Sequence, residues 1–408
     1  MKLLLLNGNG IHLSVNNSRL HIKDGRFSTT DEPEEYVFSP KRIDVDNVVI
    51  YGKNGELSID AIRWLIKHNV QITILNWDGK LLTTMLPPES VQVKTKFAQY
   101  HSYSDNSLRV ELAKKIIEAK FARTQTVLDW LKSRYPAVIN DFSKDHEMLK
   151  KTRTISEIMM VEGRVASHYW QQIRKIMPKK LEFTTREYQK KPWGAGDQLN
   201  CMLNYGYAIL EAECMRAINS SGLDVHVGFM HEMTIGKNSL AYDMQEPFRF
   251  LIDLAIIGLV EKDCMEKKDF IRTENFNLRL RPSGARKLVT EINEQFNKKI
   301  EYNGKQCLWS YVLLIKTREL AQYLLGMKKN IDFISPSIPL ERVDNEEMRE
   351  KILKISYSQW ERLGFSKGTL FYMKKNAKQN KPFSINKHVQ ERLKTYPLVE
   401  IVEKMKNS

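Results

Sequence analysis

The chain has 408 residues, of which 42% are hydrophobic, and this predicts a globular, soluble protein of two or three domains. Its 64 Lys and Arg residues outnumber 49 Asp and Glu residues, and the net charge of +15 favours a polyanionic partner, nucleic acid before an anionic membrane surface. Four widely spaced cysteines indicate neither a disulfide framework nor a zinc knuckle, and the apolar run at residues 250–260 is too short to cross a bilayer.

Residues 1–88 are predicted to form a β-rich domain. Short apolar or alternating runs are separated there by the turn sequences NGNG, NNS, KDG, GKNG and WDG. The opening MKLLLL is too short for a signal peptide and is predicted to be a strand. One helix interrupts the strands at residues 58–68, where Ser58 is placed to cap it and Ile59, Ile62 and Ile66 are expected on one apolar face, to which Trp64 and Leu65 add.

Residues 92–330 are predicted to form a helical domain. Four long segments carry apolar residues at spacings of three and four, which is the period of a helix with one buried face. These segments are residues 107–135, 155–177, 197–218 and 308–327. Together with the first 88 residues, they predict an α+β fold that is mainly α.

Residues 345–408 are predicted to form a basic helix-turn-helix DNA-binding domain. From residue 351 onward, thirteen Lys and Arg residues stand against four Asp and Glu residues, so this tail carries +9 of the total charge. A helix around residues 357–363, a turn at Gly364 and a second helix capped by Ser366 fit that motif, although small bundles also contain such pairs. The positive charge favours phosphate contacts. The expected DNA-binding residues on the second helix are Lys367, Thr369, Tyr372, Lys374 and Lys375.

Glu162 lies in the middle of the apolar stripe of the helix predicted at residues 155–177. An isolated carboxylate in such a position is costly, so it must be protonated, paired with a basic residue or bound to a cation. A buried pair with Arg or Lys is the simpler interpretation. A metal site is the alternative, and it requires further ligands.

Candidate partners for Glu162 occur in the segment HEMTIGKNSLAYDMQEPFR, where His231, Asp243 and Glu246 are expected to converge with it on one ion. Glu246 directly precedes a proline, which suits the first turn of a helix, so its carboxylate is expected at the mouth of the apolar run that follows. Oxygen ligands with a single imidazole suit Mg²⁺ or Mn²⁺ better than zinc. The alternatives are a structural histidine at His231 and a helix cap at Asp243.

Tyr205 and Tyr207 raise a different chemistry, in which a tyrosine attacks DNA and forms a covalent intermediate. Both residues lie within an apolar helical pattern, where aromatic packing is the commoner use. No arginine-rich stretch or neighbouring histidine pair accompanies them. A structural role is therefore favoured for both tyrosines, as it is for His168 and His226.

Five segments in this order resemble the CRISPR-adaptation integrase family, whose members are metal-dependent endonuclease-integrases: VEGRVASHYW, DQLNCMLNYGYAIL, GLDVHVGFMHE, GKNSLAYDMQEPFR and LRPSGARKLV. The resemblance spans most of residues 1–330. It implies a β-sheet N-terminal domain, a helical catalytic domain and a homodimer or higher homo-oligomer. By position it implies that Glu162, His231 and Glu246 bind the metal and that Asp243 is a neighbouring catalytic acid.

Two basic residues of the matching segments are expected to contact DNA, namely Lys237 and Arg249. Lys237 stands where the family usually has an arginine. This departure would weaken a contact of two parallel hydrogen bonds to one phosphate, because lysine offers a point charge rather than a planar fork.

The basic tail resembles the C-terminal extension of casposases, the homologous integrases of casposon mobile elements. This implies an enzyme that uses Mg²⁺ or Mn²⁺ to join the 3′-hydroxyl ends of donor DNA to double-stranded target DNA by transesterification, with duplication of the target site. One alternative is a CRISPR spacer-acquisition integrase that acts with a small partner protein. The other is a non-enzymatic helix-turn-helix regulator. The expected location is the cytoplasm, at the nucleoid and away from membranes.

Overall fold

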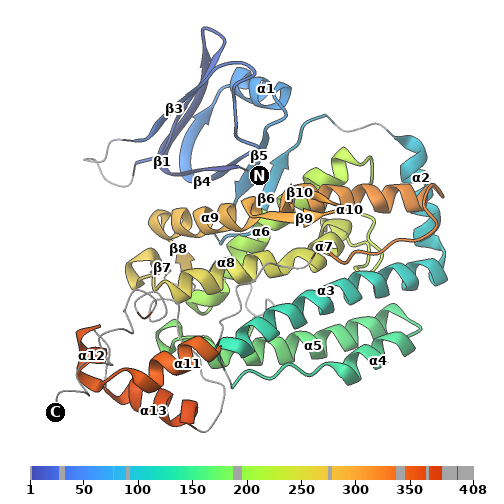
Figure 1. The fold of residues 1–408 in the computed structure, drawn as a ribbon. Helices are drawn as coiled ribbons and strands as arrows, with labels where there is room; N and C mark the ends of the chain where they lie inside the picture. The colour runs from blue at the N-terminus through green and yellow to red at the C-terminus, as the bar shows by residue number, and fades with distance from the viewer. Residues whose placement is uncertain are drawn as a thin grey trace, which may run out of the picture.

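A six-stranded sheet forms the N-terminal part of the computed structural model, which describes residues 2–26, 33–76, 78–88, 92–135, 137–186, 195–273, 278–336, 345–363, 367–378 and 393. The sheet has the order β3-β2-β1-β4-β5-β6 and stands above the helices in Figure 1. Its strands are β1 (Leu3–Asn16), β2 (Arg19–Lys23), β3 (Glu35–Phe38), β4 (Asn47–Leu57), β5 (Gln71–Leu75) and β6 (Leu81–Met85). The central pairs β1·β4 and β4·β5 are parallel, and the outer pairs are antiparallel. The predicted β-rich start is confirmed.

The predicted helix within the sheet is present as α1 (Ile59–Lys67), and the Ser58 side chain accepts a hydrogen bond from the backbone N–H of Ala61 at 3.1 Å. Its predicted apolar face is confirmed in part, because Trp64 and Leu65 are buried and Ile62 packs against the same core. Ile59 is 67% exposed, whereas the buried residues are Ala61, Trp64 and Leu65. Trp64 belongs to the core between the sheet and α1, whereas Ile59, in the first turn of the helix, does not.

The chain after the sheet is mainly helical. Its helices are α2 (Val93–Ser104), α3 (Asn106–Arg134), α4 (Ser143–Lys151), α5 (Ile155–Ile176), α6 (Gln198–Ser220), α7 (Ser239–Gln245), α8 (Arg249–Glu261), α9 (Pro282–Asn297) and α10 (Trp309–Leu324). The four long helices predicted from periodicity correspond to α3, α5, α6 and α10. Sequence analysis missed two antiparallel strand pairs, which are formed by β7 (Phe270–Arg272), β8 (Leu278–Leu280), β9 (Lys299–Tyr302) and β10 (Lys305–Leu308). The fold is α+β and mainly α, as predicted.

The sheet and the helices share one hydrophobic core. On β1, Leu3 and Leu5 pack with residues of the helical part, whereas Leu4 and Leu6 belong to a second core between the sheet and α1. This alternation follows from the two-residue period of a strand, and it explains why consecutive leucines open the chain. The change of secondary structure near residue 88 is therefore not a division of the core.

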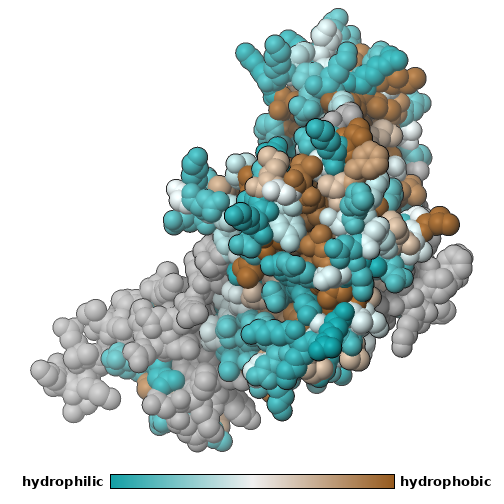
Figure 2. All heavy atoms as spheres, turned by 90° about the vertical axis from the view of Figure 1, so that its right-hand side faces the viewer, coloured by the Kyte–Doolittle hydropathy of each residue, from teal (hydrophilic) through white to brown (hydrophobic). Residues whose placement is uncertain are grey.

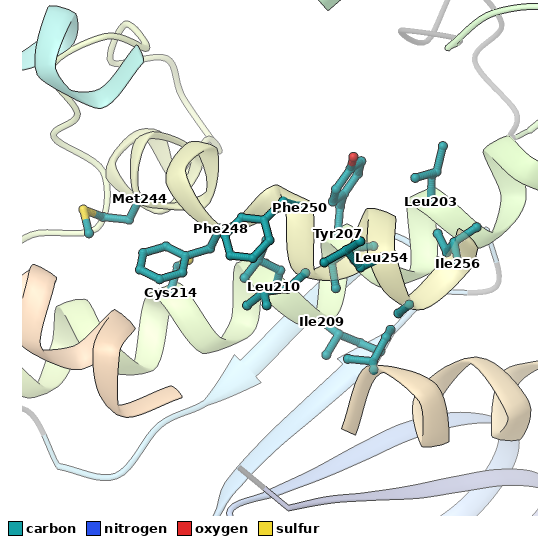
Figure 3. Close-up of a cluster of buried hydrophobic side chains, with 14 of the residues drawn as sticks. Leu203, Tyr207, Ile209, Leu210, Cys214, Met244, Phe248, Phe250, Leu254 and Ile256 are labelled. Carbon is teal, nitrogen blue, oxygen red and sulfur yellow. The ribbon is translucent and has the colours of Figure 1, made fainter. Parts of the chain in front are cut away.

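Helix α6 lies at the centre of this shared core and is buried on almost all sides. Figure 3 shows its side chains Leu203, Tyr207 and Leu210 packed with Phe250 and Leu254 of α8. The close approach of these helices brings side chains from distant parts of the chain together around α6.

Three helices in the described part of the chain after residue 344 form a small unit with its own core, at the lower left of Figure 1. They are α11 (Asn345–Lys354), α12 (Tyr357–Arg362) and α13 (Lys367–Lys378). Ser356 and Gln359 cap α12 reciprocally. Both predicted tail helices are present, but Gly364 and Ser366 lie outside the described residues.

Within the described residues, no helix is long and apolar enough to cross a bilayer.

Candidate active site

A largely buried lysine joins two of the predicted acidic residues. The Nζ atom of Lys120, on α3, contacts Oε1 of Glu162 on α5 and lies 2.6 Å from Oε2 of Glu246. The exposed fractions of the three side chains are only 11%, 20% and 5%, respectively. Glu162 therefore has the basic partner that the simpler interpretation required. The same ammonium also holds Glu246, so two predicted ligands converge on one positive charge.

Glu246 begins a short 3-10 turn, Glu246–Phe248, which joins α7 to α8. Its predicted place at the mouth of the apolar helix is confirmed, because α8 starts at Arg249. Burial alone would raise the pKa of Glu246, but the positive charges of Arg249, Lys120 and His231 outweigh burial and lower the pKa to about 2. The Arg249 Nε atom lies 3.4 Å from Oε1 of Glu246. Glu246 is thus held as a carboxylate at neutral pH.

His231 and Asp243 form a second pair in the site. Nδ1 of His231 lies 2.7 Å from Oδ1 of Asp243, which is fully buried on α7. Backbone N–H groups of Phe229, Met230 and His231 also donate to the Asp243 carboxylate. Burial lowers the pKa of His231, but the hydrogen bond and charge of Asp243 outweigh it, with help from Glu246, and the net shift is upward. The pairing uses Nδ1, which leaves Nε2 as the ring nitrogen for a further ligand.

The structure gives Asp243 a positioning role within this pair. Its two oxygens are engaged by three backbone N–H groups and the imidazole, so it fixes the ring rather than the end of a helix. Glu246 and His231 influence each other's pKa, which places both in one electrostatic site. Among the described residues, no three His, Cys, Asp or Glu side chains are arranged to hold a metal ion.

Sequence reasoning missed Lys120. Its neighbours along α3, Ile116, Ile117 and Phe121, are fully or almost fully buried, so it is a charge within an apolar helical stripe. The argument that singled out Glu162 applies equally to this lysine. Two opposite charges, each inside the buried face of a long helix, were a detectable sign of a pair.

A third buried group lies beside the lysine-carboxylate cluster. The hydroxyls of Tyr207 and Tyr169 donate to the two oxygens of Asp253 at 2.7 and 2.8 Å. Burial raises the pKa of Asp253, and the two hydroxyls and nearby positive charges oppose this shift. A small cavity of about 30 Å³ is lined by residues of both groups, including Lys120 and Glu246. The polar atoms of α5, α6 and α8 thus meet next to the site.

The two tyrosines considered as nucleophiles have structural roles. Tyr207 binds Asp253, and the Tyr205 hydroxyl bonds to that of Tyr51. Burial raises the pKa of Tyr205 and of Tyr207 well above the ordinary value, which opposes formation of a phenolate. His168 and His226 bond to backbone carbonyl groups, which also agrees with a structural role.

A wider groove of about 510 Å³ adjoins the site and is formed by β6, α6, α7 and the loop before α7. Lys80, Arg186 and Arg249 contribute positive charges to its lining, and Glu211 contributes a carboxylate. Arg249 also lines the small cavity, and its guanidinium lies 4.6 Å from the centre of the Tyr207 ring. The groove therefore leads from a basic surface to the acidic site.

The other predicted DNA-binding residues differ in their surroundings. Lys237 is exposed next to Gly236 and Asn238, which line the groove. Lys375 is exposed on α13. Lys374 was expected to be exposed, but it is half-buried and donates to the backbone oxygen of Leu353 at 3.2 Å, because α13 packs against α11. The side chains of Lys367, Thr369 and Tyr372 lie outside the described part of the structure.

Comparison with known proteins shows a consistent set of similarities. The family described as CRISPR associated protein Cas1 matches residues 6–294. The CRISPR-associated endonuclease Cas1 1 of Archaeoglobus fulgidus is 29% identical over 354 residues, covering 81% of this chain and 99% of that protein. A solved structure described as "Casposase bound to integration product" is 58% identical, with a TM-score of 0.82, and covers 88% of this chain and 100% of that chain. A CAS1 protein from Thermotoga maritima, at 19% identity and a TM-score of 0.66 over 80% of this chain and 97% of that chain, has the same fold.

Proposed function

This chain belongs to the family of CRISPR-associated Cas1 proteins, and from that membership we propose that it is a casposase-type DNA integrase. The observation that carries the proposal is the convergence of two carboxylates, the partly buried Glu162 and the buried Glu246, on one positive charge beside the His231–Asp243 pair. The 58% identity with a casposase bound to an integration product supports DNA joining as the reaction. Helices α11 to α13 and their positive charge favour this function over that of a spacer integrase that depends on a small partner protein.

The donor chemistry of this site suits a divalent cation, although in the described structure Lys120 contacts both carboxylates and no three side chains are yet arranged around an ion. The Lys120 ammonium marks a place where oxygens of Glu162 and Glu246 already surround a positive charge, and His231 can add a nitrogen ligand. Carboxylate oxygens with one imidazole suit Mg²⁺ or Mn²⁺. We expect Glu162, His231 and Glu246 to hold the ion. When bound, it would make the donor hydroxyl a better nucleophile and neutralise charge on the target phosphate.

The protein groups prepare the strand transfer. Asp243 orients the imidazole of His231, and Arg249 presents a positive charge where the groove meets the acidic site. The 3′-hydroxyl of the donor gives up its proton to water, and its oxygen forms a bond to a phosphorus of the target strand. The bond from that phosphorus to the target's own 3′-oxygen breaks, and the released oxygen takes up a proton. The reaction exchanges one phosphodiester for another, so it requires no covalent protein intermediate.

The proposed partners are double-stranded donor and target DNA and a second copy of this chain. A net charge of +15 favours phosphate contacts, and Lys237 and Lys375 are exposed to make them. On α2, Val93 and Phe97 are 58% and 62% exposed, on a side of the molecule where Figure 2 shows hydrophobic side chains at the surface. A homo-oligomer would cover such a surface and bring two sites to two DNA ends. We place this activity at the nucleoid in the cytoplasm.

The test is a strand-transfer assay with Mn²⁺, a linear donor and a supercoiled plasmid. We expect joined products from the wild type and a loss of at least about 10²-fold in joining rate for Glu162→Gln and for His231→Ala, because each removes a group from the reacting centre. Glu147→Gln and His101→Ala remove an exposed carboxylate and an exposed imidazole elsewhere and should join normally. Equal joining by all five proteins would refute the site, and DNA binding without joining by the wild type would favour the regulator.

A further inference from the structure

We propose that Lys120 is a further catalytic residue of this integrase. Its ammonium holds Glu162 and Glu246 together in the free protein, and it contacts the target phosphate once a divalent cation takes its place between these carboxylates. The inference rests on the proposed integrase function. It concerns a residue of α3, an element that supplies none of the expected metal ligands.

The first step of the argument is the geometry of the free site. Lys120 touches a carboxylate of α5 and one of the turn before α8, and its side chain is 11% exposed. Two carboxylates this close repel each other and have lost much of their hydration, so they require a counter-charge to remain ionised. Lys120 supplies that counter-charge. It lets the site form before any metal binds.

The second step is competition for the same oxygens. Oε1 of Glu162 and Oε2 of Glu246 are both engaged by one Nζ atom. A cation that binds between them must therefore displace the ammonium. A lysine is suited to this exchange because its charge sits at the end of a flexible four-carbon stem. The cavity of about 30 Å³ beside Lys120 gives the side chain room to move.

The third step is the balance of charge after the exchange. Lys120 and Arg249 match the charges of Glu162 and Glu246 in the free site, so a divalent cation adds two positive charges, and the buried carboxylate of Asp243 offsets one of them. Buried positive charge of this size requires an anion. A phosphodiester brings one negative charge and gains about one more as the attacking oxygen adds to it in the transition state. The displaced ammonium then lies beside the group on which negative charge develops.

These steps predict opposite effects of one substitution, Lys120→Met, which keeps an unbranched side chain only one atom shorter and removes its charge. Mn²⁺ binding to the protein without DNA, measured by titration calorimetry, should become tighter on the order of tenfold, because the competing ammonium is gone. The rate of strand transfer at saturating Mn²⁺ should fall by about 10²-fold, because the phosphate loses a charged contact. A residue that only supported the fold would not strengthen metal binding.

The matched control is Lys132→Met, which removes the same charge from an exposed position on the same helix. It should leave Mn²⁺ affinity and joining unchanged. If Lys120→Met does not fold without metal, Mn²⁺ should restore its folding, because the cation replaces the ammonium between the carboxylates. Failure of Mn²⁺ to do so would overturn the inference.

Two results in a folded Lys120→Met protein would also overturn the proposal. Weaker Mn²⁺ binding would show that Lys120 does not compete for the carboxylates, and an unchanged joining rate would show that it does not contact the phosphate. Failure of the wild type and of Lys132→Met to join DNA would instead refute the integrase function, and with it the catalytic role of Lys120. The measurement of Mn²⁺ affinity needs no DNA. It therefore tests the competition between the Lys120 ammonium and the cation independently of the joining reaction.

Discussion

Single charged residues inside apolar helix faces define the chemistry of this protein. Glu162, Lys120 and Asp253 each lie next to buried residues of a helix, and each is paired with side chains from distant parts of the chain. Burial makes an unmatched charge costly, so such residues persist where a partner or a ligand balances them. The partners of Asp253 are two tyrosine hydroxyls, and these neutral donors stabilise a carboxylate less than an ammonium does.

Asp253 should therefore make stability depend on pH. Because burial raises its pKa above 3.8 in the folded protein, its contribution to the free energy of unfolding is present below pH 3.8 and is lost as the pH rises through the raised pKa. Asp253→Asn cannot ionise. The difference in unfolding free energy between wild type and variant, measured by urea titration over this pH range, should fall as the pH rises. A difference that is constant with pH would contradict the raised pKa.

At the scale of elements, the packing of α6 against α8 brings the tyrosine of one helix to the acid of the other. Gly206 permits this approach, because a Cβ atom there would lie 2.4 Å from Cγ2 of Ile252. Gly163 on α5 is different, since a Cβ atom there would meet no atom within 4 Å. Gly206 is thus required by the close packing of two helices, whereas packing does not require a glycine at position 163.

The two glycines should respond oppositely to alanine. Gly206→Ala should lower the free energy of unfolding by about 1–3 kcal/mol, because the helices must separate to admit the methyl group. Gly163→Ala should raise it by up to about 1 kcal/mol, because alanine favours the helix and meets no clash. Urea unfolding monitored by circular dichroism checks both changes. Destabilisation by both variants alike would disprove the packing argument.

At the scale of the whole molecule, one hydrophobic core unites the sheet and the helical part, a second lies between the sheet and α1, and a third belongs to the unit of α11, α12 and α13. The tail unit therefore folds around its own residues, chiefly Ile352, Ile355, Trp360 and Leu370. Its charge and its separate core suit an additional DNA-binding domain. Removal of such a domain should leave the active site intact.

Deletion of residues 345–408 tests this arrangement. The shortened protein should keep the unfolding midpoint of its main body and its joining activity on generic DNA, because no residue of the main core is lost. Its preference for particular donor ends or target sequences should decline. Competition assays between specific and random DNA measure this preference. Complete loss of joining in a folded, shortened protein would contradict the separation of the two roles.

Local sequence rules determined a large part of this structure. The period of apolar residues located α3, α5, α6 and α10, and Ser58 identified the start of α1. These features depend on neighbours within one or two turns, so they can be read along the chain. Strands of three or four residues, such as β7 and β8, are too short to show an alternating pattern, and they were missed.

The tertiary structure alone decided how the candidate site is balanced. The sequence nominated Glu162, His231, Asp243 and Glu246 from burial logic, residue type and family resemblance. It did not show that Lys120, 42 residues before Glu162, would supply the shared counter-charge. That pairing depends on the packing of α3 and α5 and on the turn before α8. Partners for buried charges come from whichever distant segments the core brings together, and no local pattern records that choice.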